Sequence, residues 1–223
     1  MPYKSIHKIA DADFPTRWGH FRILGFEGTR TDARQDCAPS AAGGPQTDGP
    51  YTEGLVALVM GDVHGSAPVM RIHSQCLTGD VFGSLRCDCR QQLELALGRI
   101  SSEGAGILLY EQQEGRGIGL MAKLRAYELQ DQGRDTVEAN EELGYAADCR
   151  EYELPVAVLK LLGVGRVRLM TNNPEKVAAL ESAGIKVVER ISAEVAPQES
   201  FRKYIETKHE KMGHILEAQI ADS

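Results

Sequence analysis

The sequence contains no long apolar run. Residues 1–20 hold no apolar stretch of signal-peptide length, and no segment reaches the ~18 consecutive apolar residues that a membrane-spanning helix requires. Basic residues are also in the minority, since 25 Lys and Arg face 32 Asp and Glu for a net charge of −7. We therefore expect a cytoplasmic protein without nucleic-acid or membrane partners, in which an anionic ligand binds only in a local basic pocket.

Cysteine is scarce as well. The chain has five, an odd number that weakens a full disulfide framework, and 223 residues are enough to bury a core without covalent staples. Three of them lie in "CLTGDVFGSLRCDC", as Cys76, Cys87 and Cys89, with the spacing C-x10-C-x-C. Cys37 lies in a polar, loop-like segment, and we interpret it as incidental.

Two interpretations of the cysteine cluster remain open. Three thiolates and one open position suit a hydrolytic zinc ion, whereas structural zinc sites close with four protein ligands. A fourth ligand is not evident, because His73 ends a strand pattern and Cys149 is distant in the sequence. The alternative is a set of buried, reduced thiols that only pack. The close spacing beside the polar residues Arg86 and Asp88 favours the metal site.

The order of the elements favours an α/β fold, a single domain with a mixed sheet and flanking helices. Apolar runs predict strands over residues 21–27, 54–62, 68–73, 106–110, 166–170 and 185–190. Other segments predict helices over residues 90–104, 117–133, 152–163, 173–184 and 199–216. We assign residues 21–217 to the domain, in which residues 30–52 form a flexible polar insertion. Residues 1–20 are expected to be an N-terminal extension, and residues 218–223 a C-terminal tail.

Two turns that follow predicted strands carry phosphate-type chemistry. "EQQEGRGIGL", residues 111–120, offers glycines, a helix start and Arg116, although it matches neither G-x-G-x-x-G nor a Walker A loop. A plain strand–turn–helix is the alternative. In "TNNPEKV", Asn173 and Pro174 are explained by a helix start, whereas Thr171 and Lys176 also suit a phosphate or a purine edge.

A polar stretch over residues 135–154 is expected to be a solvated surface. Asp148 and Arg150 flank Cys149 within it. A carboxylate two residues from a guanidinium is more often a surface ion pair than a catalytic pair, so these residues alone do not predict a function.

Taken in series, these segments resemble the GTP cyclohydrolase II family. The motifs are "RIHSQCLTGDVFGSLRCDCRQQLE", "GILLYEQQEGRGIGLMAKLRAYELQDQGRDTVEAN", "LGYAAD", "LLGVGRVRLMTNNPEKV", "AGIKVVER" and "TKHEKMGH", and the match runs from about Glu53 to Leu216. The resemblance implies that the imidazole ring of GTP is opened by hydrolysis, with release of carbon 8 as formate and of pyrophosphate. The product would be 2,5-diamino-6-ribosylamino-4(3H)-pyrimidinone 5′-phosphate, made in the first step of riboflavin biosynthesis. The resemblance also implies one zinc ion (Zn2+) per subunit, magnesium (Mg2+) and a homodimer.

The same resemblance assigns residues by their position. It implies Cys76, Cys87 and Cys89 as ligands of a zinc ion that makes water nucleophilic for attack on carbon 8. It implies a GTP-binding site made of Arg71, Ile72, His73, Ser74, Gln75, Gln92, Glu114, Gly115, Arg116, Thr136, Thr171 and Lys176. Within that site, the side chains of Glu114 and Gln92 suit guanine, and the cations of Arg116 and Lys176 suit the phosphates.

Three further residues resemble the catalytic group of the family. Asp148 matches its proposed proton acceptor, and Tyr127 matches a tyrosine thought to assist ring opening. Arg150 matches the residue proposed to attack the α-phosphate. Because a guanidinium stays protonated in proteins, Arg150 also suits a simpler role, as a cation that stabilises the phosphoryl transition state. A carboxylate-held magnesium ion would then clamp the phosphates.

The chain departs from the family pattern at Gln75, where glutamate is common, and in the insertion over residues 30–52. No dihydroxybutanone phosphate synthase domain precedes the match, so we expect a monofunctional chain. Gln75 motivates a second hypothesis, a paralogue that stops at the formylamino pyrimidine. A third hypothesis is an enzyme that supplies an azapteridine-type pathway, and a fourth is a non-catalytic nucleotide-binding module with a structural metal.

Overall fold

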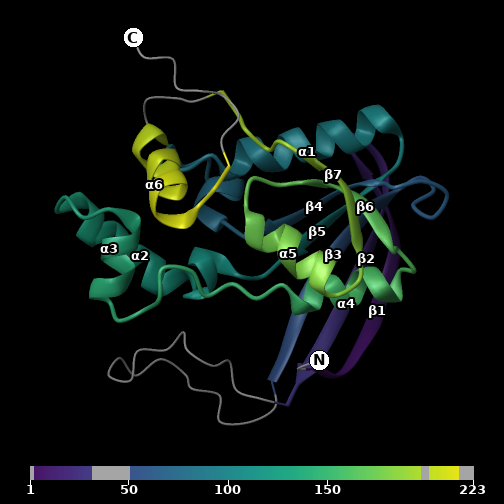
Figure 1. Ribbon diagram of the computed structural model, residues 1–223, viewed down its shortest axis with the longest axis horizontal. Helices are drawn as coiled ribbons and strands as arrows, with labels where there is room; N and C mark the ends of the chain where they lie inside the picture. Colours follow the sequence, from purple (N-terminus) through teal and green to yellow (C-terminus); the bar gives the residue numbers. More distant parts are fainter. Residues whose placement is uncertain (1–2, 32–50, 197–200, 216–223) are drawn as a thin grey trace.

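The computed structural model describes residues 3–31, 51–196 and 201–215, which fold around a mixed β-sheet (Figure 1). The strands are β1 (Tyr3–Thr16), β2 (Gly19–Arg30), β3 (Tyr51–Met60), β4 (Val69–Ser74), β5 (Gly106–Glu111), β6 (Arg166–Met170) and β7 (Lys186–Ile191). The helices are α1 (Cys89–Glu103), α2 (Leu120–Asp131), α3 (Thr136–Glu142), α4 (Glu153–Leu161), α5 (Pro174–Ser182) and α6 (Arg202–Met212), with a π-helical turn η1 (Leu77–Val81) and a 3-10 turn η2 (Glu114–Gly117). The predicted α/β class is confirmed.

The sheet has an antiparallel half and a parallel half. Within the described residues its strand order is β1-β2-β3-β5-β4-β6-β7. Neighbours among β1, β2, β3 and β5 pair antiparallel, whereas β4 pairs parallel with both β5 and β6, and β7 runs parallel to β6. The carboxyl ends of β4, β5 and β6 therefore meet at one edge, which is where ligands bind in open α/β sheets.

Alternating side chains give the sheet two apolar faces. On β4, Met70 and Ile72 pack in the core shared with α4 and α5, whereas Val69 packs in the core shared with α1. Because successive residues of a strand point to opposite faces, Arg71 and His73 lie on the α1 face. Both are buried polar side chains near the carboxyl end of the strand.

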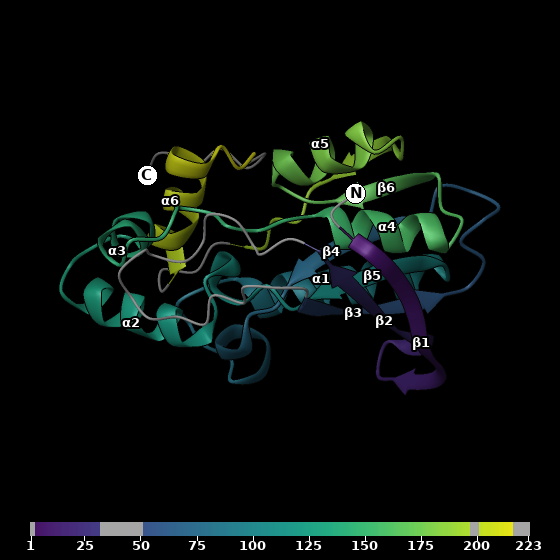
Figure 2. The same ribbon diagram turned by 90° about the horizontal axis from the view of Figure 1, so that it is seen from below.

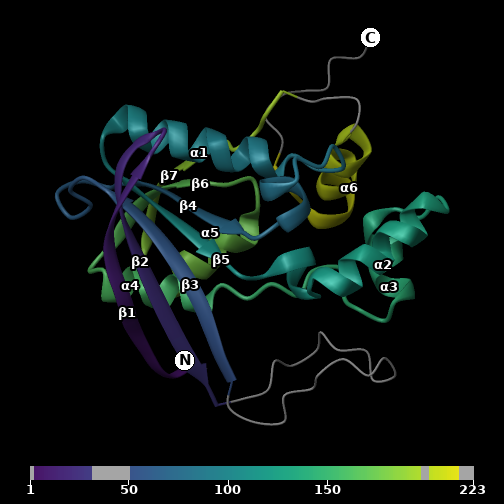
Figure 3. The same ribbon diagram turned by 180° about the vertical axis from the view of Figure 1, so that it is seen from behind.

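The helices fall into three groups. One sheet face is covered by α1 and the other by α4 and α5 (Figures 1 and 3). The remaining helices, α2, α3 and α6, gather at the end of the sheet where β4 and β5 stop (Figure 2). In the part of the chain that the structure describes, none of the helices has the length and apolar character that a bilayer-crossing segment needs.

One strand and one helix were not predicted. Residues 3–16 were expected to be an N-terminal extension, but they form β1, which pairs with β2 along its length. Most side chains of β1 are exposed, and the segment has no run of apolar residues from which a buried strand could be predicted. Helix α3 begins inside the polar stretch, where the Asp135 carboxylate accepts hydrogen bonds from the backbone N–H groups of Val137 and Glu138. This capping box starts a helix without any apolar run.

Parts of the predicted organisation lie outside the described residues. These are residues 32–50, which make up most of the predicted insertion and include Cys37, and the predicted tail over residues 218–223. At the limits of the predicted insertion, Arg30 closes β2 and Tyr51 opens β3.

Replacing Gly98 with alanine is expected to stabilise the protein. Gly98 lies in the middle of α1, and a Cβ atom added there meets no atom of the described residues within 4 Å apart from the adjoining helix backbone. Because glycine costs more backbone entropy than alanine in a helix, the free energy of unfolding should rise by about 0.5–1 kcal/mol. Urea unfolding at constant zinc concentration measures it, and a decrease would show that α1 does not tolerate the added methyl group.

Candidate active site

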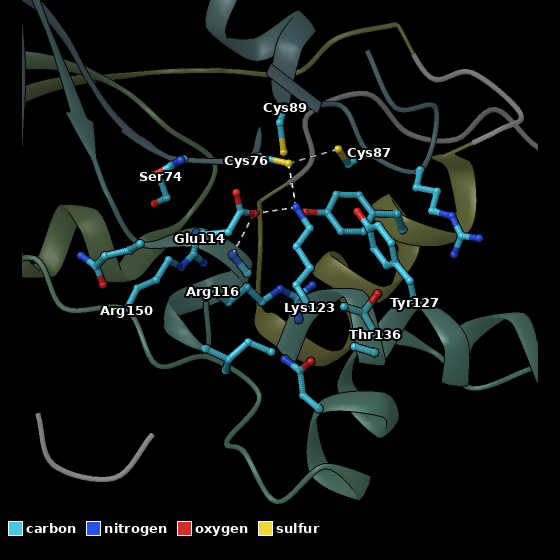
Figure 4. Close-up of a pocket in the computed structure, with 18 of the residues that line it drawn as sticks. Ser74, Cys76, Cys87, Cys89, Glu114, Arg116, Lys123, Tyr127, Thr136 and Arg150 are labelled. Atoms are coloured by element: carbon cyan, nitrogen blue, oxygen red, sulfur yellow. Dashed lines mark hydrogen bonds and ion pairs between the residues drawn. The ribbon is translucent and has the colours of Figure 1, made fainter. Parts of the chain in front are cut away.

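Three thiol groups converge at the carboxyl edge of the sheet. Cys76 follows β4, Cys87 lies in the loop after η1, and Cys89 is the first residue of α1. The three sulfur atoms lie within 4.8 Å of one another, and those of Cys76 and Cys87 are 3.7 Å apart. Figure 4 shows them gathered at one end of a pocket. The fold therefore brings together ligand atoms that are separated by up to a dozen residues in the sequence.

The cluster fits a metal ion. Gly79 of η1 faces the thiols, and a Cβ atom at this position would lie 2.9 Å from the sulfur of Cys87 and 3.1 Å from that of Cys76. Hydrogen bonds from Cys87 and Cys89 lower the pKa of the Cys76 thiol, so one thiolate is already favoured. Among the described residues the cluster has three ligands and no fourth, which is the donor set of a zinc site with an open position.

A buried carboxylate fixes the start of the cysteine loop, residues 76–89. Asp80 of η1 accepts hydrogen bonds from Nε2 of His73 at 3.1 Å, from the hydroxyl of Tyr110 at 2.9 Å and from the backbone N–H of Cys76 at 3.1 Å. Since His73 lies on β4 and Tyr110 on β5, these bonds tie the loop to two central strands. The ring of His73 also stacks on that of Tyr110, with 5.5 Å between their centroids.

Lys123 of α2 joins the thiols to the turn after β5. Its Nζ atom lies 3.1 Å from the sulfur of Cys76, 3.0 Å from the hydroxyl of Thr78 and 2.7 Å from a carboxylate oxygen of Glu114 (Figure 4). Glu114 also accepts a hydrogen bond of 2.6 Å from the backbone N–H of Leu77. Burial opposes the charge of Lys123, but the Cys76 thiolate and the Glu114 carboxylate outweigh it and raise the pKa of Lys123.

The thiols lie in the wall of a pocket. Beside the three cysteines it is lined by Ser74, Gln75, Glu114, Gly115, Arg116, Lys123, Tyr127, Thr136 and Arg150, among others. The hydroxyl of Tyr127 lies 3.1 Å from that of Thr78, in the cysteine loop. Burial raises the pKa of Tyr127, so this hydroxyl stays protonated and can donate a hydrogen bond to a ligand.

The turn η2 holds Arg116 in an unusual backbone conformation. Gly115 and Arg116 have φ values of 64° and 62°, and among the described residues Arg116 is the one non-glycine residue with positive φ. Its carbonyl accepts a hydrogen bond of 2.9 Å from the backbone N–H of Cys149. Its Nη2 atom is buried and has no partner among the described residues. Such an unpaired buried donor is costly unless a ligand accepts from it.

Asp148 and Arg150 form a buried ion pair, although we expected this stretch to be a solvated surface. Nε of Arg150 lies 2.9 and 3.1 Å from the two carboxylate oxygens, and Nη2 contacts the same carboxylate. The side chain of Arg150 is 12% exposed and that of Asp148 is 15% exposed. Burial opposes both charges, but Arg150 lowers the pKa of Asp148, and Tyr152 with Asp148 raises that of Arg150. The guanidinium therefore stays protonated.

A second cavity adjoins the first and is rich in cations. The two share Ser74, Cys89, Arg116, Arg150 and Tyr204 as lining residues. The second cavity is lined by Arg71, His73, Ser74, Cys89, Gln92, Arg116, Arg150, Thr171, Asn172, Asn173, Lys176, Tyr204, Lys208, Met212 and His214. Five of these residues are Arg or Lys and none is Asp or Glu, so an acidic protein concentrates positive charge here.

Among the described residues, several cations of this second cavity have only neutral hydrogen-bond partners. Arg71 donates to the side-chain oxygen of Gln92 at 2.6 Å and to the carbonyl of Met170 at 3.2 Å, and its buried Nε has no partner among the described residues. Lys176 donates to the carbonyl of Ile72 at 2.9 Å. Burial lowers the pKa of Lys176 to about 7. A polyanion in this cavity would supply the missing acceptors and negative charge.

Lys176→Met is expected to raise stability near neutral pH, because a buried lysine favours its neutral form. Between pH 7 and the ordinary value of 10.5, the unfolded chain holds a proton at Lys176 that the folded chain lacks, so wild-type stability rises with pH. The variant should be more stable by about 1 kcal/mol or more at pH 7.5, and the difference should shrink toward pH 10. Parallel urea titrations across this range measure it, and a difference independent of pH would contradict the shifted titration.

The two cavities bring together most of the residues that the resemblance assigns to the GTP site. Ile72 is an exception, because its side chain packs in the core and only its carbonyl meets Lys176. Asp148 lines neither cavity but pairs with Arg150, which lines both. Thr136, at the start of α3, and Gln75 both line the first cavity.

Both side chains expected to contact guanine are bonded to the protein. Gln92 accepts from Arg71 and donates to Asp88 at 2.5 Å. Glu114 bonds Lys123 and the backbone of the cysteine loop. Each has further capacity for hydrogen bonds, but each also holds its neighbours in place.

Two site residues were missed by sequence reasoning. Lys123 lies four residues before Tyr127 on α2, so helical spacing alone places both on one face of the helix. Asp80 lies inside the C-x10-C segment, where a lone carboxylate gives no signal for its buried bonds to two strands. The first could have been predicted from spacing, and the second could not.

Comparison with known proteins places this site in a family. A family model described as GTP cyclohydrolase II matches residues 7–192. The chain is 51% identical to GTP cyclohydrolase-2 of Enterobacter sp. (strain 638) and 50% identical to that of Escherichia coli O9:H4 (strain HS). Each alignment covers 212 residues, 95% of this chain and 98% of the relative. A two-domain 3,4-dihydroxy-2-butanone 4-phosphate synthase from A. baumannii matches 87% of this chain and 41% of its own, with 15% identity and a TM-score of 0.41. By its sequence, the chain is an enzyme of the GTP cyclohydrolase II family.

Proposed function

We propose that this enzyme hydrolyses GTP to formate, pyrophosphate and 2,5-diamino-6-ribosylamino-4(3H)-pyrimidinone 5′-phosphate. One observation carries the proposal: a cluster of three thiols opens into a pocket that adjoins a cavity lined by five cations. The first part suits a hydrolytic zinc ion and the second suits a triphosphate. Arg150 lines both cavities, so it lies where the base end and the phosphate end of one nucleotide would meet.

The residues of the second cavity would orient the substrate by its phosphates. Arg71, Arg116 and Lys176 offer donors that lack anionic partners among the described residues. Bonds to phosphate oxygens would satisfy the buried Nε of Arg71 and Nη2 of Arg116. With the phosphates held there, the purine would extend into the first pocket and bring carbon 8 toward the thiol cluster.

The chemistry at carbon 8 is hydrolytic. One water cleaves the C8–N9 bond to leave a formamide, and a second hydrolyses the formamide to formate and an amine. Zinc, when bound to Cys76, Cys87 and Cys89, supplies the Lewis acid that makes water a nucleophile at neutral pH. Tyr127 keeps a proton on its hydroxyl in the wall of this pocket, and we propose that it donates this proton to a nitrogen of the opening ring. Asp148 remains our candidate for proton acceptor, although its carboxylate is bonded to Arg150.

Release of pyrophosphate is a separate hydrolysis at the α-phosphate. Arg150 stays protonated because Asp148 holds it, so we assign to it the stabilisation of negative charge in the phosphoryl transition state. We expected a carboxylate-held magnesium ion, but no Asp or Glu of the described residues lines the cation-rich cavity, so magnesium that enters with the substrate would neutralise the leaving pyrophosphate. We further propose a homodimer, one zinc ion per subunit and a place at the start of riboflavin biosynthesis.

The test is product analysis of the zinc-loaded protein with GTP and magnesium. Equal yields of formate and pyrophosphate, with the pyrimidine product identified by mass spectrometry, would support the proposal. Pyrophosphate with a formylamino pyrimidine and no formate would instead favour the paralogue that stops early, for which Gln75 in the pocket wall is the motive. GTP recovered intact after prolonged incubation would overturn the enzymatic function.

A further inference from the structure

Helix α6 forms a wall of the cation-rich cavity. Tyr204 and Lys208 of α6, with Met212 at its end and His214 just after it, line this cavity. The family model ends at residue 192, so the whole helix lies beyond the matched segment. Figures 1 and 2 show α6 beside α3 at the end of the sheet where β4 stops. The cavity is therefore completed by a segment outside the residues that the family model matches, although this segment carries the motif "TKHEKMGH" of the resemblance.

Lys208 is held in place from two sides. Its Nζ atom donates to a carboxylate oxygen of Asp88 at 3.0 Å and lies 4.2 Å from the centre of the Tyr204 ring. The side chain of Lys208 is 13% exposed, and that of Asp88 is 5% exposed. An ammonium group has three N–H donors, and this ion pair engages one of them. Lys208 is thus a fixed, mostly buried cation with donors to spare.

The side chains around Lys208 in the cation-rich cavity favour binding of an anion. No Asp or Glu in the described part of the chain lines the cavity, whereas Arg71, Arg116, Arg150 and Lys176 all do. Nε of Arg71 and Nη2 of Arg116 are buried and lack partners among the described residues. Burying a fifth cation beside these four is unfavourable unless a polyanion compensates for the charge. Asp88 pairs with Lys208 and Asp148 pairs with Arg150, but Arg71, Arg116 and Lys176 have no ion-pair partner among the described residues.

We propose that Lys208 is a further polyphosphate-binding residue and that α6 forms the wall of the site that holds the phosphates. This inference rests on the proposed function for the identity of the natural ligand, a nucleoside triphosphate. The cavity chemistry itself predicts binding of any polyphosphate of that size. Free tripolyphosphate is therefore a probe that does not depend on turnover.

The experiment compares Lys208→Gln with Lys211→Gln in the full-length, zinc-loaded protein. Both lysines tie α6 to the rest of the chain through an ion pair, Lys208 to Asp88 and Lys211 to Asp135, but only Lys208 lines the cavity. Titration calorimetry with tripolyphosphate should show a Kd about tenfold to hundredfold higher for Lys208→Gln, as expected for a hydrogen bond to a charged group. The KM for GTP should rise in parallel. Lys211→Gln should bind like the wild type, and Lys208→Arg should recover most of the affinity.

Three results would overturn the inference. These are tripolyphosphate binding unchanged in Lys208→Gln, an equal loss in Lys211→Gln, and no tripolyphosphate binding by the wild-type protein. Zinc content and far-ultraviolet circular dichroism identify a variant that has lost its fold. If Lys208→Gln has lost its fold, the tripolyphosphate affinity of Lys208→Arg tests the inference instead, and binding near that of the wild type supports it. Failure of the proposed function is distinguishable, because tripolyphosphate would then still bind while GTP yields neither formate nor pyrophosphate.

Discussion

Cys87→Ser is expected to abolish formate release and to leave the purified protein with less than one zinc ion per chain. A serine hydroxyl stays protonated at neutral pH, so the cluster would lose one of its three anionic ligands. Formate formation should fall by about 10³-fold or more, because activation of water by a metal is worth several kcal/mol. Pyrophosphate release, which we assign to Arg150 and magnesium, should persist at a lower rate. Metal analysis and separate assays of the two products measure these effects.

A change that keeps all three thiols tests the geometry of the same site. In Gly79→Ala, the new methyl carbon would lie 2.9 Å from the sulfur of Cys87 and 3.1 Å from that of Cys76, where it obstructs the space between them. Zinc affinity and formate release should both fall. Gly98→Ala is the matched control, because its methyl group meets nothing within 4 Å. Full zinc content and normal formate release in Cys87→Ser and Gly79→Ala would show that the thiols are not the zinc site.

The cysteine cluster shows how much of the site a sequence can reveal. The spacing of Cys76, Cys87 and Cys89 permits one metal but equally permits three packed thiols, since spacing alone does not say where the chain turns back. In the structure the reversal is made by η1, which Asp80 ties to β4 and β5. The hydrogen bond between Asp80 and Tyr110 joins residues far apart in the sequence, so no local sequence pattern predicts it. The ligands could thus be predicted, but the support that brings them together could not.

In the second cavity, separate turns could be predicted from the sequence, but their position around one cavity could not. The turns that carry Arg116 and Lys176 were predicted separately as phosphate-type turns, because a glycine-rich turn or a helix start has a local signature. That the two turns adjoin one cavity follows from the parallel pairing of β5, β4 and β6, in which the ends of all three strands share an edge. Lys208 joins them from a polar helix far along the chain, and its ion pair with Asp88 depends on tertiary packing alone.

The burial of charged side chains in the polar stretch, residues 135–154, also differs from the prediction. Asp148 and Arg150 were predicted to be a surface pair because charged residues two apart are common on surfaces. In the structure both side chains are mostly buried, and Cys149 between them anchors the turn of Arg116 through its backbone N–H. The sequence gives the residue types of this pair but not their burial. Because the pair is buried, Asp148 holds the guanidinium of Arg150 in a fixed position at the cavity wall.

Arg150→Lys is expected to lower the rate of pyrophosphate release by about 10²–10³-fold, the cost of losing one fixed donor to a developing phosphoryl charge. Nε and Nη2 of Arg150 bond Asp148, which leaves Nη1 outside this pair. A lysine ammonium has a shorter reach and no planar fork, so it cannot hold Asp148 and the substrate in the same geometry. Zinc content should not change. Arg168→Lys, which alters an ion pair with Glu103 outside both cavities, is the control and should leave the rate unchanged.

The same residue allows the electrostatic role to be separated from covalent catalysis. A nucleophilic Arg150 would carry a guanylyl group through a P–N bond, which survives alkaline denaturation but not acid. The structure argues against such an adduct, because a guanidinium whose pKa is raised by Tyr152 and Asp148 has no free electron pair to attack phosphorus. Intact-protein mass spectrometry after a rapid alkaline quench during turnover should therefore show unmodified protein. Accumulation of a guanylylated chain in the wild type, absent from Arg150→Lys, would make Arg150 the nucleophile and would require that Asp148 release it during the reaction.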